Sequence, residues 1–226
     1  MDKYFIKEGY VPNKQSDFLD SQTASWIYQA AIYEFAQEIM QRHNLKSMLD
    51  IGCGFGVKLK EFILPVCADI TGVDIEHTIA NCQKMYNFGN WFVDNIEEPY
   101  LKLDRKFDLI ISADVIEHLV DPDTLLDYAK KHAHADTFII ISTPERDLVR
   151  GGDNLQSANI AHVREWNQDE FYQYITSRGF QVLDHFFVEA SRRPTLIGRL
   201  RLMMARLIRN TKTNQVILCK IKNDAS

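Results

Sequence analysis

The residues best suited to chemistry follow a short apolar run, 47–51, that leads into alternating glycines. Asp50 lies at the carboxyl end of this run, and the turn after it comprises Gly52, Cys53, Gly54 and Gly56. A residue without a Cβ atom can adopt a positive φ and lets a ligand lie against bare backbone. A dinucleotide fingerprint would need glycine at Val57, and a phosphate loop would need a following Gly-Lys-Ser/Thr run, so both are excluded. We therefore expect a different ligand at the carboxyl end of this strand, where open α/β sheets bind.

Carboxylates follow the next two predicted strands. Asp74 follows the apolar run 68–73 and is placed to accept hydrogen bonds from both hydroxyls of a ribose, as in nucleotide-binding sheets. Hydrogen bonds to a charged group contribute roughly 1.5–3 kcal/mol each. The alternative role of Asp74 is an N-cap for the helix expected from Glu76. Asp94 follows the strand expected at 90–93, a position that is also typical of a simple Asx turn.

These segments arrive in an order and at spacings that resemble the class I S-adenosylmethionine (SAM)-dependent methyltransferases. The resemblance covers residues 46–142 and includes the apolar strand 107–113 with the Asp114-Val-Ile-Glu117-His118 segment after it. It implies SAM as the cofactor and an in-line displacement at the methyl carbon, to which positioning contributes about 7–11 kcal/mol. The cofactor-binding residues implied by the resemblance are Asp50, Gly52, Cys53, Gly54, Gly56, Asp74, Ile75, Asp94, Asn95, Ile96 and Ala113.

The same resemblance makes His118 the first choice for a general base. His118 would lie just past the carboxyl end of the strand 107–113, near the expected methyl group. An alcohol acceptor must lose its proton during transfer, and a well-placed base contributes about 10²–10⁴-fold to the rate. The alternative is a structural histidine. Glu117 and His162 complete the predicted catalytic set.

A second resemblance concerns a metal. Asp114-x-x-Glu117-His118 combined with a later His162 resembles the Glu-x-x-Glu-His…His site of the small-RNA 3′-terminal 2′-O-methyltransferases, which also have a Thr-Pro segment and a Trp like Thr143-Pro144 and Trp166. Two imidazoles and two carboxylates suit Mg²⁺, Mn²⁺ or Zn²⁺. Such a cation could orient a vicinal diol and lower its hydroxyl pKa. The departure from that family is Asp114, whose side chain is one methylene shorter than glutamate. Without a metal, His162 and Arg164 would instead close a lid or contact the acceptor.

Alternating helical and strand patterns predict an α/β fold. Helices are expected at 21–43, from about 55, and at 76–86, 122–132 and 168–178. Strands are expected at 47–51, 68–73, 90–93, 107–113, 137–142, 180–189 and 214–221. Such alternation favours a parallel sheet covered by helices on both faces. The resemblance implies a single Rossmann-like domain with a seven-stranded, mostly parallel sheet in the order 3-2-1-4-5-7-6, in which the last strand is antiparallel.

We expect residues 1–226 to form one domain, in which three segments are added to the central α/β fold. Residues 1–45 would form an arm and a helix, and the aperiodic stretch 143–166 would form a lid loop. Residues 191–212 combine basic side chains with helical apolar spacing, which predicts an amphipathic insertion touching an anionic membrane or a phosphorylated carrier. Packing on the domain or a partner subunit is the alternative. Lys58 and Lys60 are expected to be solvated, unless one of them meets an anionic group.

Composition narrows the classes of function. The net charge of −5 argues against nonspecific nucleic-acid binding by the whole surface. Four cysteines without C-x-x-C spacing suggest buried thiols, not a zinc ribbon or a disulfide framework. No apolar signal region and no apolar run of about 18 residues are visible, so a cytoplasmic location is expected.

The stretch after the fifth predicted strand also resembles bacterial methyltransferases associated with surface-polysaccharide synthesis. Ser142-Thr-Pro-Glu-Arg146, Gly151-Gly-Asp-Asn154 and His162-Val-Arg-Glu-Trp166 carry this resemblance. It implies O-methylation of a glycan or a related small molecule, at a hydroxyl or a sugar-linked phosphate. The alternatives are an RNA 2′-O-methyltransferase, which the acidic balance disfavours, a ubiquinone-pathway-like catechol O-methyltransferase, and a non-catalytic SAM-binding subunit. The last is disfavoured because the glycines and the ribose carboxylate are both present.

Overall fold

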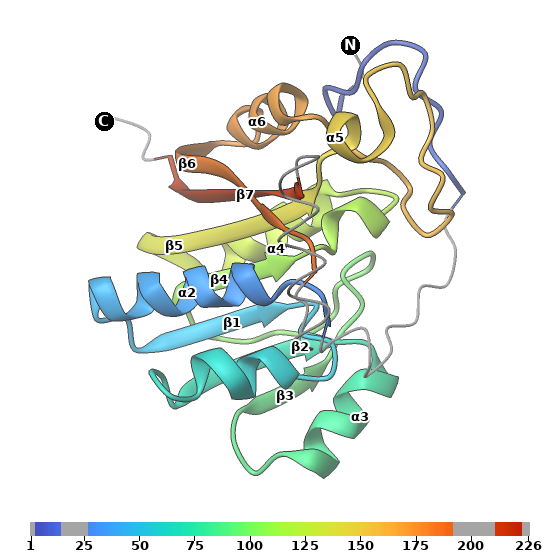
Figure 1. The fold of residues 1–226 in the computed structure, drawn as a ribbon. Coiled ribbons are helices and arrows are strands. Elements are labelled where there is room, and N and C mark those ends of the chain that lie inside the picture. Colours follow the sequence, from blue (N-terminus) through green and yellow to red (C-terminus); the bar gives the residue numbers. More distant parts are fainter. Residues whose placement is uncertain (1–2, 15–26, 192–210, 223–226) are drawn as a thin grey trace.

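A seven-stranded sheet organises the chain in the order β3-β2-β1-β4-β5-β7-β6 (Figure 1). This computed structural model describes residues 3–14, 27–191 and 211–222. The strands are β1 (Ser47–Ile51), β2 (Asp69–Asp74), β3 (Asn90–Val93), β4 (Phe107–Ala113), β5 (Ala133–Pro144), β6 (Phe180–Glu189) and β7 (Lys212–Ile221). Strands β1 to β5 pair in parallel, and β7 is antiparallel to both β5 and β6. The predicted fold class and strand order are confirmed.

Helices cover both faces of the sheet because its central strands are apolar on both sides. They are α2 (Ala30–His43), α3 (Glu76–Met85), α4 (Asp123–His132), α5 (Arg146–Arg150) and α6 (Gln168–Ser177). Successive residues of β1 point to opposite layers: Met48 packs with α2, α3 and the π-helical turn Leu59–Ile63, and Leu49 packs with α4 and α6. The helix predicted from residue 21 is confirmed over α2, and residues 15–26 lie outside the described part of the chain.

The stretch after β4 and β5 positions the site. A 3₁₀ turn, Ile116–His118, follows β4, and β5 extends to Pro144, two residues beyond its predicted end. The predicted loop 143–166 therefore contains the end of β5 and the short helix α5. It finishes at Trp166, which is fully buried and stacks on Tyr174 with ring centroids 5.5 Å apart. A lid role for this loop remains a prediction.

Residues 3–14 form an arm that lies beside the loop 151–166 (Figure 1). Backbone hydrogen bonds join Val11 to Leu155 and Asn13 to Val163, at 2.7 and 2.9 Å. The indole nitrogen of Trp166 donates to the carbonyl of Tyr4 at 2.8 Å. The first segment of the chain thus packs on a loop about 150 residues later in the sequence.

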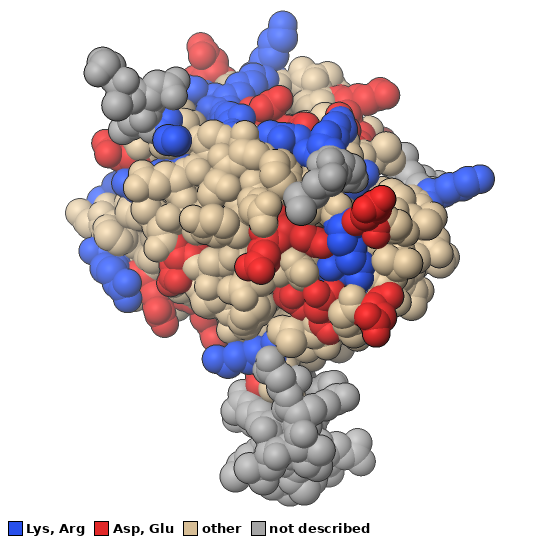
Figure 2. Space-filling view, turned by 90° about the horizontal axis from the view of Figure 1, so that it is seen from above, with Lys and Arg blue, Asp and Glu red and all other residues tan. Residues whose placement is uncertain are grey.

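Acidic and basic side chains are interspersed on the face seen in Figure 2, around an area that carries no charge. Most of the predicted basic insertion, residues 192–210, lies outside the described part of the chain, so its contacts stay a prediction. Among the described residues, no helix has both the length and the apolar character that a membrane crossing requires.

Candidate active site

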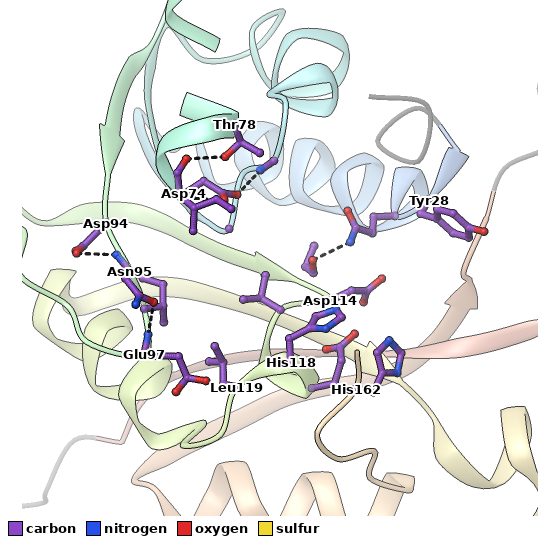
Figure 3. Close-up of a pocket in the computed structure, with 18 of the residues that line it drawn as sticks. Tyr28, Asp74, Thr78, Asp94, Asn95, Glu97, Asp114, His118, Leu119 and His162 are labelled. Atoms are coloured by element: carbon purple, nitrogen blue, oxygen red, sulfur yellow. Dashed lines mark hydrogen bonds between the residues drawn. The ribbon is translucent and has the colours of Figure 1, made fainter. Parts of the chain in front are cut away.

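A cavity of about 940 Å³ opens at the carboxyl ends of β1, β2, β3 and β4 (Figure 3). This is the edge of a parallel sheet where α/β proteins bind ligands. The volume is near the upper end of the roughly 300–1,000 Å³ typical of ligand sites, which leaves room for more than one small molecule. Eight of the eleven predicted cofactor residues line it: Gly52, Gly54, Asp74, Ile75, Asp94, Asn95, Ile96 and Ala113.

The glycine turn is closed by hydrogen bonds to the neighbouring strand. The amide of Gly52 donates to the Val73 carbonyl at 2.8 Å, and Gly54 donates to the Asp74 carboxylate at 2.7 Å. Gly52 has a φ of +81°, and a Cβ atom there would lie 2.4 Å from a methyl group of Val115. Only glycine fits this position, for backbone and for packing reasons.

The second carboxylate oxygen of Asp74 accepts from the amide of Ile75 at 2.7 Å. The N-cap position of α3 is Ile75 and has no side-chain cap, so the alternative role of Asp74 as a helix cap is wrong. Asp74 instead joins the glycine turn to the cavity wall. A carboxylate held between two backbone amides has a defined orientation toward the cavity.

Three predicted cofactor residues, Asp50, Cys53 and Gly56, do not line the cavity. Asp50 is fully buried behind the turn and accepts a hydrogen bond from the Tyr33 hydroxyl at 2.7 Å. Cys53 is also buried. A Cβ atom on Gly56 would lie 2.7 Å from the Trp91 ring, so this glycine permits close packing. These residues support the turn from behind.

The expectation that Lys58 is solvated is wrong, whereas Lys60 is exposed as expected. The Lys58 side chain is buried and lines the cavity, with its Nζ atom 5.5 Å from the centre of the Tyr33 ring. Burial raises the pKa of Asp50 to about 7, with Asp74 adding to the effect, while Tyr33 and the Lys58 charge oppose it. The lysine therefore brings positive charge to a region that would otherwise be strongly acidic.

We expect ionisation of Asp50 to lower the stability of the protein as pH rises from about 4 to about 7. Its carboxyl binds a proton more tightly in the folded state, where its pKa is about 7, than in the unfolded chain, where it is 3.8. Ionisation therefore costs folding free energy across this window, by up to about 4 kcal/mol above pH 7. Asp50→Asn should remove this component, as urea unfolding of both proteins between pH 4 and pH 8 would measure. Parallel stability curves would contradict the prediction.

The segment after β3 both places a carboxylate on the cavity and forms an Asx turn. Asp94 lines the cavity, yet its carboxylate accepts from the backbone amides of Asn95 and Tyr100, each at 3.0 Å, and of Leu101 at 3.3 Å. The Asn95 side chain accepts from the amide of Glu97 at 3.1 Å, which is an Asx turn (Figure 3). The Asp94 carboxylate thus has two roles: it holds the backbone of the cavity wall, and it lines the cavity where a ligand would bind.

Glu117, His118 and His162 all line the cavity, and the two histidines lie across it from Asp74 (Figure 3). Each offers a ligand atom, and these atoms lie within 4.8 Å of one another. The two imidazole rings are 4.9 Å apart and nearly perpendicular. His118 Nδ1 lies 2.7 Å from the Ala161 carbonyl oxygen, which can only accept, so Nδ1 carries the proton and Nε2 keeps its lone pair.

Asp114, predicted as a fourth ligand, does not belong to this group. Its backbone has a φ of +55°, and its carboxylate accepts from Ser142 Oγ at 2.6 Å and Asn214 Nδ2 at 2.8 Å. Both partners come from neighbouring strands, β5 and β7. The carboxylate is therefore held by the sheet, and the prediction of Asp114 as a ligand in this arrangement is not supported.

The electrostatics of the group suit a neutral His118 ring. Burial, and then the neighbouring His162, lowers the pKa of His118 to about 4. Burial and the charge of Asp114 raise the pKa of Glu117. One oxygen of Glu117 is buried without a hydrogen-bond partner among the described residues. A general base works best with a pKa near the working pH, so His118 is better suited to ligation than to proton abstraction.

Sequence reasoning missed a carboxylate that contacts this group, although it lies in the motif quoted for His162. Glu165 is fully buried, and His162 donates to it at 2.6 Å. Burial would raise the pKa of Glu165, but hydrogen bonds from His162, Arg150 and Ser157 lower it to about 2. The spacing of three residues between His162 and Glu165 was the available signal.

Arg164, considered above for acceptor binding, instead ties the loop to the turn after β4. It donates to the carbonyls of Leu119 and Val120 at 3.0 and 2.8 Å, and its guanidinium lies 4.1 Å from the centre of the Tyr4 ring. It does not line the cavity. Gln29, which the sequence did not single out, does line it and donates to the Ala113 carbonyl at 2.9 Å.

Comparisons with known proteins agree with this geometry. A family model described as a methyltransferase domain matches residues 26–185. The ubiquinone biosynthesis O-methyltransferase of Hydrogenovibrio crunogenus is 23% identical over 119 residues, which cover 50% of this chain and 48% of that protein. The small RNA 2′-O-methyltransferase of Mus musculus is 28% identical over 160 residues, covering 62% of this chain and 39% of that protein. The matched part thus spans no more than about half of either relative.

A solved structure shares the fold. The crystal structure of an S-adenosylmethionine-dependent methyltransferase from Clostridium acetobutylicum superposes with a TM-score of 0.61 at 16% identity, over 90% of this chain and 94% of that one. The family model covers well over half of the chain, from the helix before β1 into β6. The chain therefore belongs to the methyltransferase-domain family, within the class I SAM-dependent methyltransferase superfamily that its sequence predicted.

Proposed function

We propose that this protein transfers a methyl group from SAM to a hydroxyl of a sugar or a related small molecule, with the help of a divalent cation. The observation that carries the proposal is that one cavity joins two sets of residues. The glycine turn and Asp74 lie on one wall, and Glu117, His118 and His162 lie on the other. The first set suits a nucleoside and the second suits an oxygen acceptor that must be held and deprotonated.

For the cofactor, we assign the two wall segments that follow β1 to β3. The carboxylate of Asp74 would accept hydrogen bonds from the ribose hydroxyls, and the Asp94-Asn95-Ile96 segment would meet the adenine. The backbone at Gly52 and Gly54 leaves space for the methionine part. Lys58 lines the cavity, and we assign it to the carboxylate of the methionine part of SAM. Its burial would strengthen such a contact between opposite charges.

For the cation, the donor set fits. Glu117 has a buried oxygen without a partner among the described residues. Both histidines use Nδ1 for a hydrogen bond to oxygen, so in each neutral ring the lone pair is on Nε2, the atom that a cation would bind. Two imidazoles and one carboxylate with open positions suit a catalytic divalent ion such as Mn²⁺, Zn²⁺ or Mg²⁺. When bound, such an ion acts as a Lewis acid that lowers the pKa of an acceptor hydroxyl.

The lining of the cavity favours a neutral acceptor over a phosphate. Its carboxylates are Asp74, Glu76, Asp94, Glu97, Asp114 and Glu117. Lys58 is the single lysine or arginine among the described lining residues. An anionic acceptor would be repelled by this field, whereas a sugar hydroxyl would not. We therefore place the reaction on a glycan or small-molecule hydroxyl, in keeping with the resemblance to polysaccharide-associated methyltransferases.

Two other acceptors have specific support. The Glu-His…His cluster and the similarity to the mouse small RNA 2′-O-methyltransferase favour the 3′-terminal ribose of an RNA, which presents a vicinal diol. The similarity to ubiquinone biosynthesis O-methyltransferases favours a catechol. The acidic cavity weighs against RNA more than against a catechol or a sugar, because RNA carries phosphates beside its terminal diol.

A transfer assay with radiolabelled SAM tests the proposal. The purified protein is offered nucleotide sugars, neutral glycans, catechols and a short RNA, each with Mg²⁺, Mn²⁺ or Zn²⁺ and each with a chelator. We expect transfer to a neutral hydroxyl acceptor that is lost on chelation and restored by one of the ions. Transfer at full rate with the chelator would contradict the metal, and failure to bind SAM or S-adenosylhomocysteine in calorimetry would contradict the enzyme function.

A further inference from the structure

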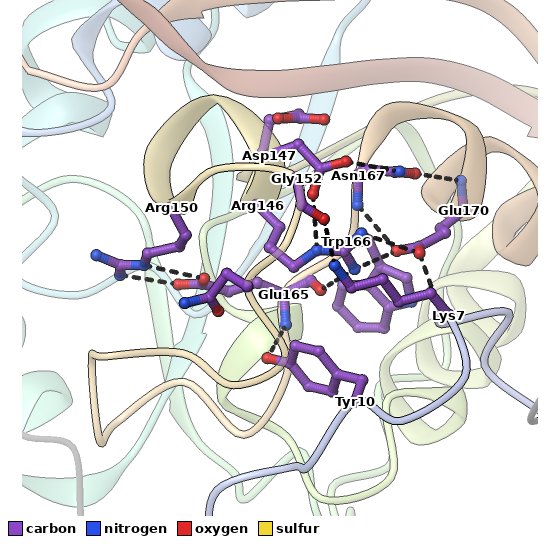
Figure 4. A network of polar contacts seen from close by, with 12 residues as sticks. Lys7, Tyr10, Arg146, Asp147, Arg150, Gly152, Glu165, Trp166, Asn167 and Glu170 are labelled. Carbon is purple, nitrogen blue, oxygen red and sulfur yellow. Dashed lines mark hydrogen bonds and ion pairs between the residues drawn. The ribbon is translucent and has the colours of Figure 1, made fainter.

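Glu165 sits at the centre of a buried set of hydrogen bonds beside His162. Its Oε1 atom accepts from His162 Nδ1 at 2.6 Å, from Ser157 Oγ at 2.8 Å and from an Arg150 nitrogen at 3.0 Å. Its Oε2 atom accepts from Arg150 Nε at 3.2 Å (Figure 4). The Glu165 side chain is fully buried, whereas Arg150 is partly exposed. Glu165 is outside the cavity lining, so it does not face the acceptor.

These contacts determine which nitrogen of His162 carries a proton. An ionised carboxylate can only accept, so the short contact to Nδ1 requires a proton on Nδ1. In the neutral ring, Nε2 then keeps the lone pair. The two-point contact from Arg150 and the hydroxyl of Ser157 hold the carboxylate in one orientation, because a fork of guanidinium donors restricts rotation of its partner. The His162 ring is thus held by a carboxylate whose own orientation is fixed by Arg150 and Ser157.

The backbone around His162 is held separately, by the arm. Asn13 Nδ2 donates at 3.0 Å to three carbonyls of this loop, those of Ser157, Asn159 and His162. The amide of Glu165 donates to the Tyr10 hydroxyl at 3.0 Å. The arm already holds the backbone of this loop. The Glu165 side chain is therefore not needed for that purpose, and its role is to orient the His162 ring. The loop can therefore keep its path when that one carboxylate is altered.

We propose that Glu165, braced by Arg150 and Ser157, is a positioning residue that keeps His162 in the Nδ1–H tautomer and directs Nε2 toward Glu117 and His118. The inference rests on the proposed function, because the reason for keeping Nε2 of His162 unprotonated is that this atom would bind the proposed cation. Carboxylates that accept from the far nitrogen of a ligating histidine contribute about 10–100-fold to metal affinity or activity. The tautomer itself is a property of the chain and can be measured without cation, cofactor or acceptor.

The test compares Glu165→Gln with a matched control, Glu170→Gln. Glu170 is also buried and also binds an arginine, Arg146, at 3.0 Å, but it does not contact a histidine. Both substitutions exchange a buried carboxylate for an amide of equal size. The first readout is the ¹⁵N spectrum of the histidine rings at pH 8, which distinguishes the two tautomers, with His162 assigned by its loss in His162→Gln. The second readout is the Kd for Mn²⁺ or Zn²⁺ from calorimetry.

We expect the wild type and Glu170→Gln to show the Nδ1–H form of His162. In Glu165→Gln the Nε2–H form should be populated and the Kd for the ion should rise about 10–100-fold, with SAM affinity unchanged. A wild-type ring in the Nε2–H form, or an unchanged tautomer and Kd in Glu165→Gln, would overturn the inference, and the wild-type measurement stands even if that variant does not fold. A wild type that binds no ion contradicts the proposed metal chemistry, while the tautomers still decide the role of Glu165.

Discussion

Methyl transfer to a hydroxyl acceptor should fall by about 10²-fold or more in Glu117→Gln, with no change in the Kd for SAM. Glutamine keeps the size of the side chain but removes the only carboxylate of the three-residue group. Its amide would also place a donor where Glu117 has a buried oxygen without a partner among the described residues. Cation binding should fall together with kcat. The measurements are metal analysis of the purified protein, kcat/KM at saturating ion, and calorimetry with SAM.

Asp114→Asn is the matched control for this prediction. Asp114 lies three residues earlier and lines the same cavity, but its carboxylate accepts from Ser142 and Asn214. We expect this variant to retain its metal content. If Asp114→Asn lost the ion and Glu117→Gln kept it, the ligand assignment from the structure would be wrong and the four-ligand prediction from sequence would regain support. Normal transfer by Glu117→Gln would contradict the metal chemistry itself.

The second large effect is expected on cofactor binding, at the cavity wall that contains Asp74. Asp74→Ala should weaken SAM and S-adenosylhomocysteine binding by about 10²-fold or more, because two hydrogen bonds to a charged group contribute at least about 3 kcal/mol together. The variant also removes the acceptor for the amides of Gly54 and Ile75, which should loosen the glycine turn. Calorimetry with both ligands measures the loss.

Glu76→Gln serves as the control for Asp74→Ala. Glu76 lines the same cavity two residues later, but its side chain is exposed and belongs to the first turn of α3. Removing its charge should change SAM affinity little, since exposed charges are screened by water and salt. Equal losses in the two variants would mean that the net charge of the cavity matters, and not a specific contact to the ribose.

Much of the fold could be predicted from sequence because its signals are local. The apolar run of β4 and the alternating glycines after β1 specify a buried strand and a turn with positive φ whatever surrounds them. β1, β3, β4 and β6 have their predicted bounds. The start of β5 was missed because residues there, such as the half-buried His134 and the exposed Asp136, show no strand periodicity.

The site could be predicted only in part, for reasons seen at particular residues. Asp74 and His118 both line the cavity, because Asp74 ends β2, His118 lies in the turn after β4, and both strands end at the cavity. Lys58 was expected in water, but its burial depends on the packing of α2 and Tyr33. Asp114 was expected beside Glu117, but the strand pairing of β4 with β5 offers its carboxylate two donors elsewhere.

The sequence by itself determined the order of strands and helices, the glycine turn and the family, since these depend on residue type and on spacing along the chain. The tertiary structure alone decided which side chains share a cavity and which ring nitrogen of His118 and His162 faces a hydrogen-bond acceptor. His118 and His162 are 44 positions apart, and Asn13, which holds the backbone of His162, lies 149 positions before it. Contacts over such separations follow from how helices, loops and sheet pack together, and no local pattern of residues records them.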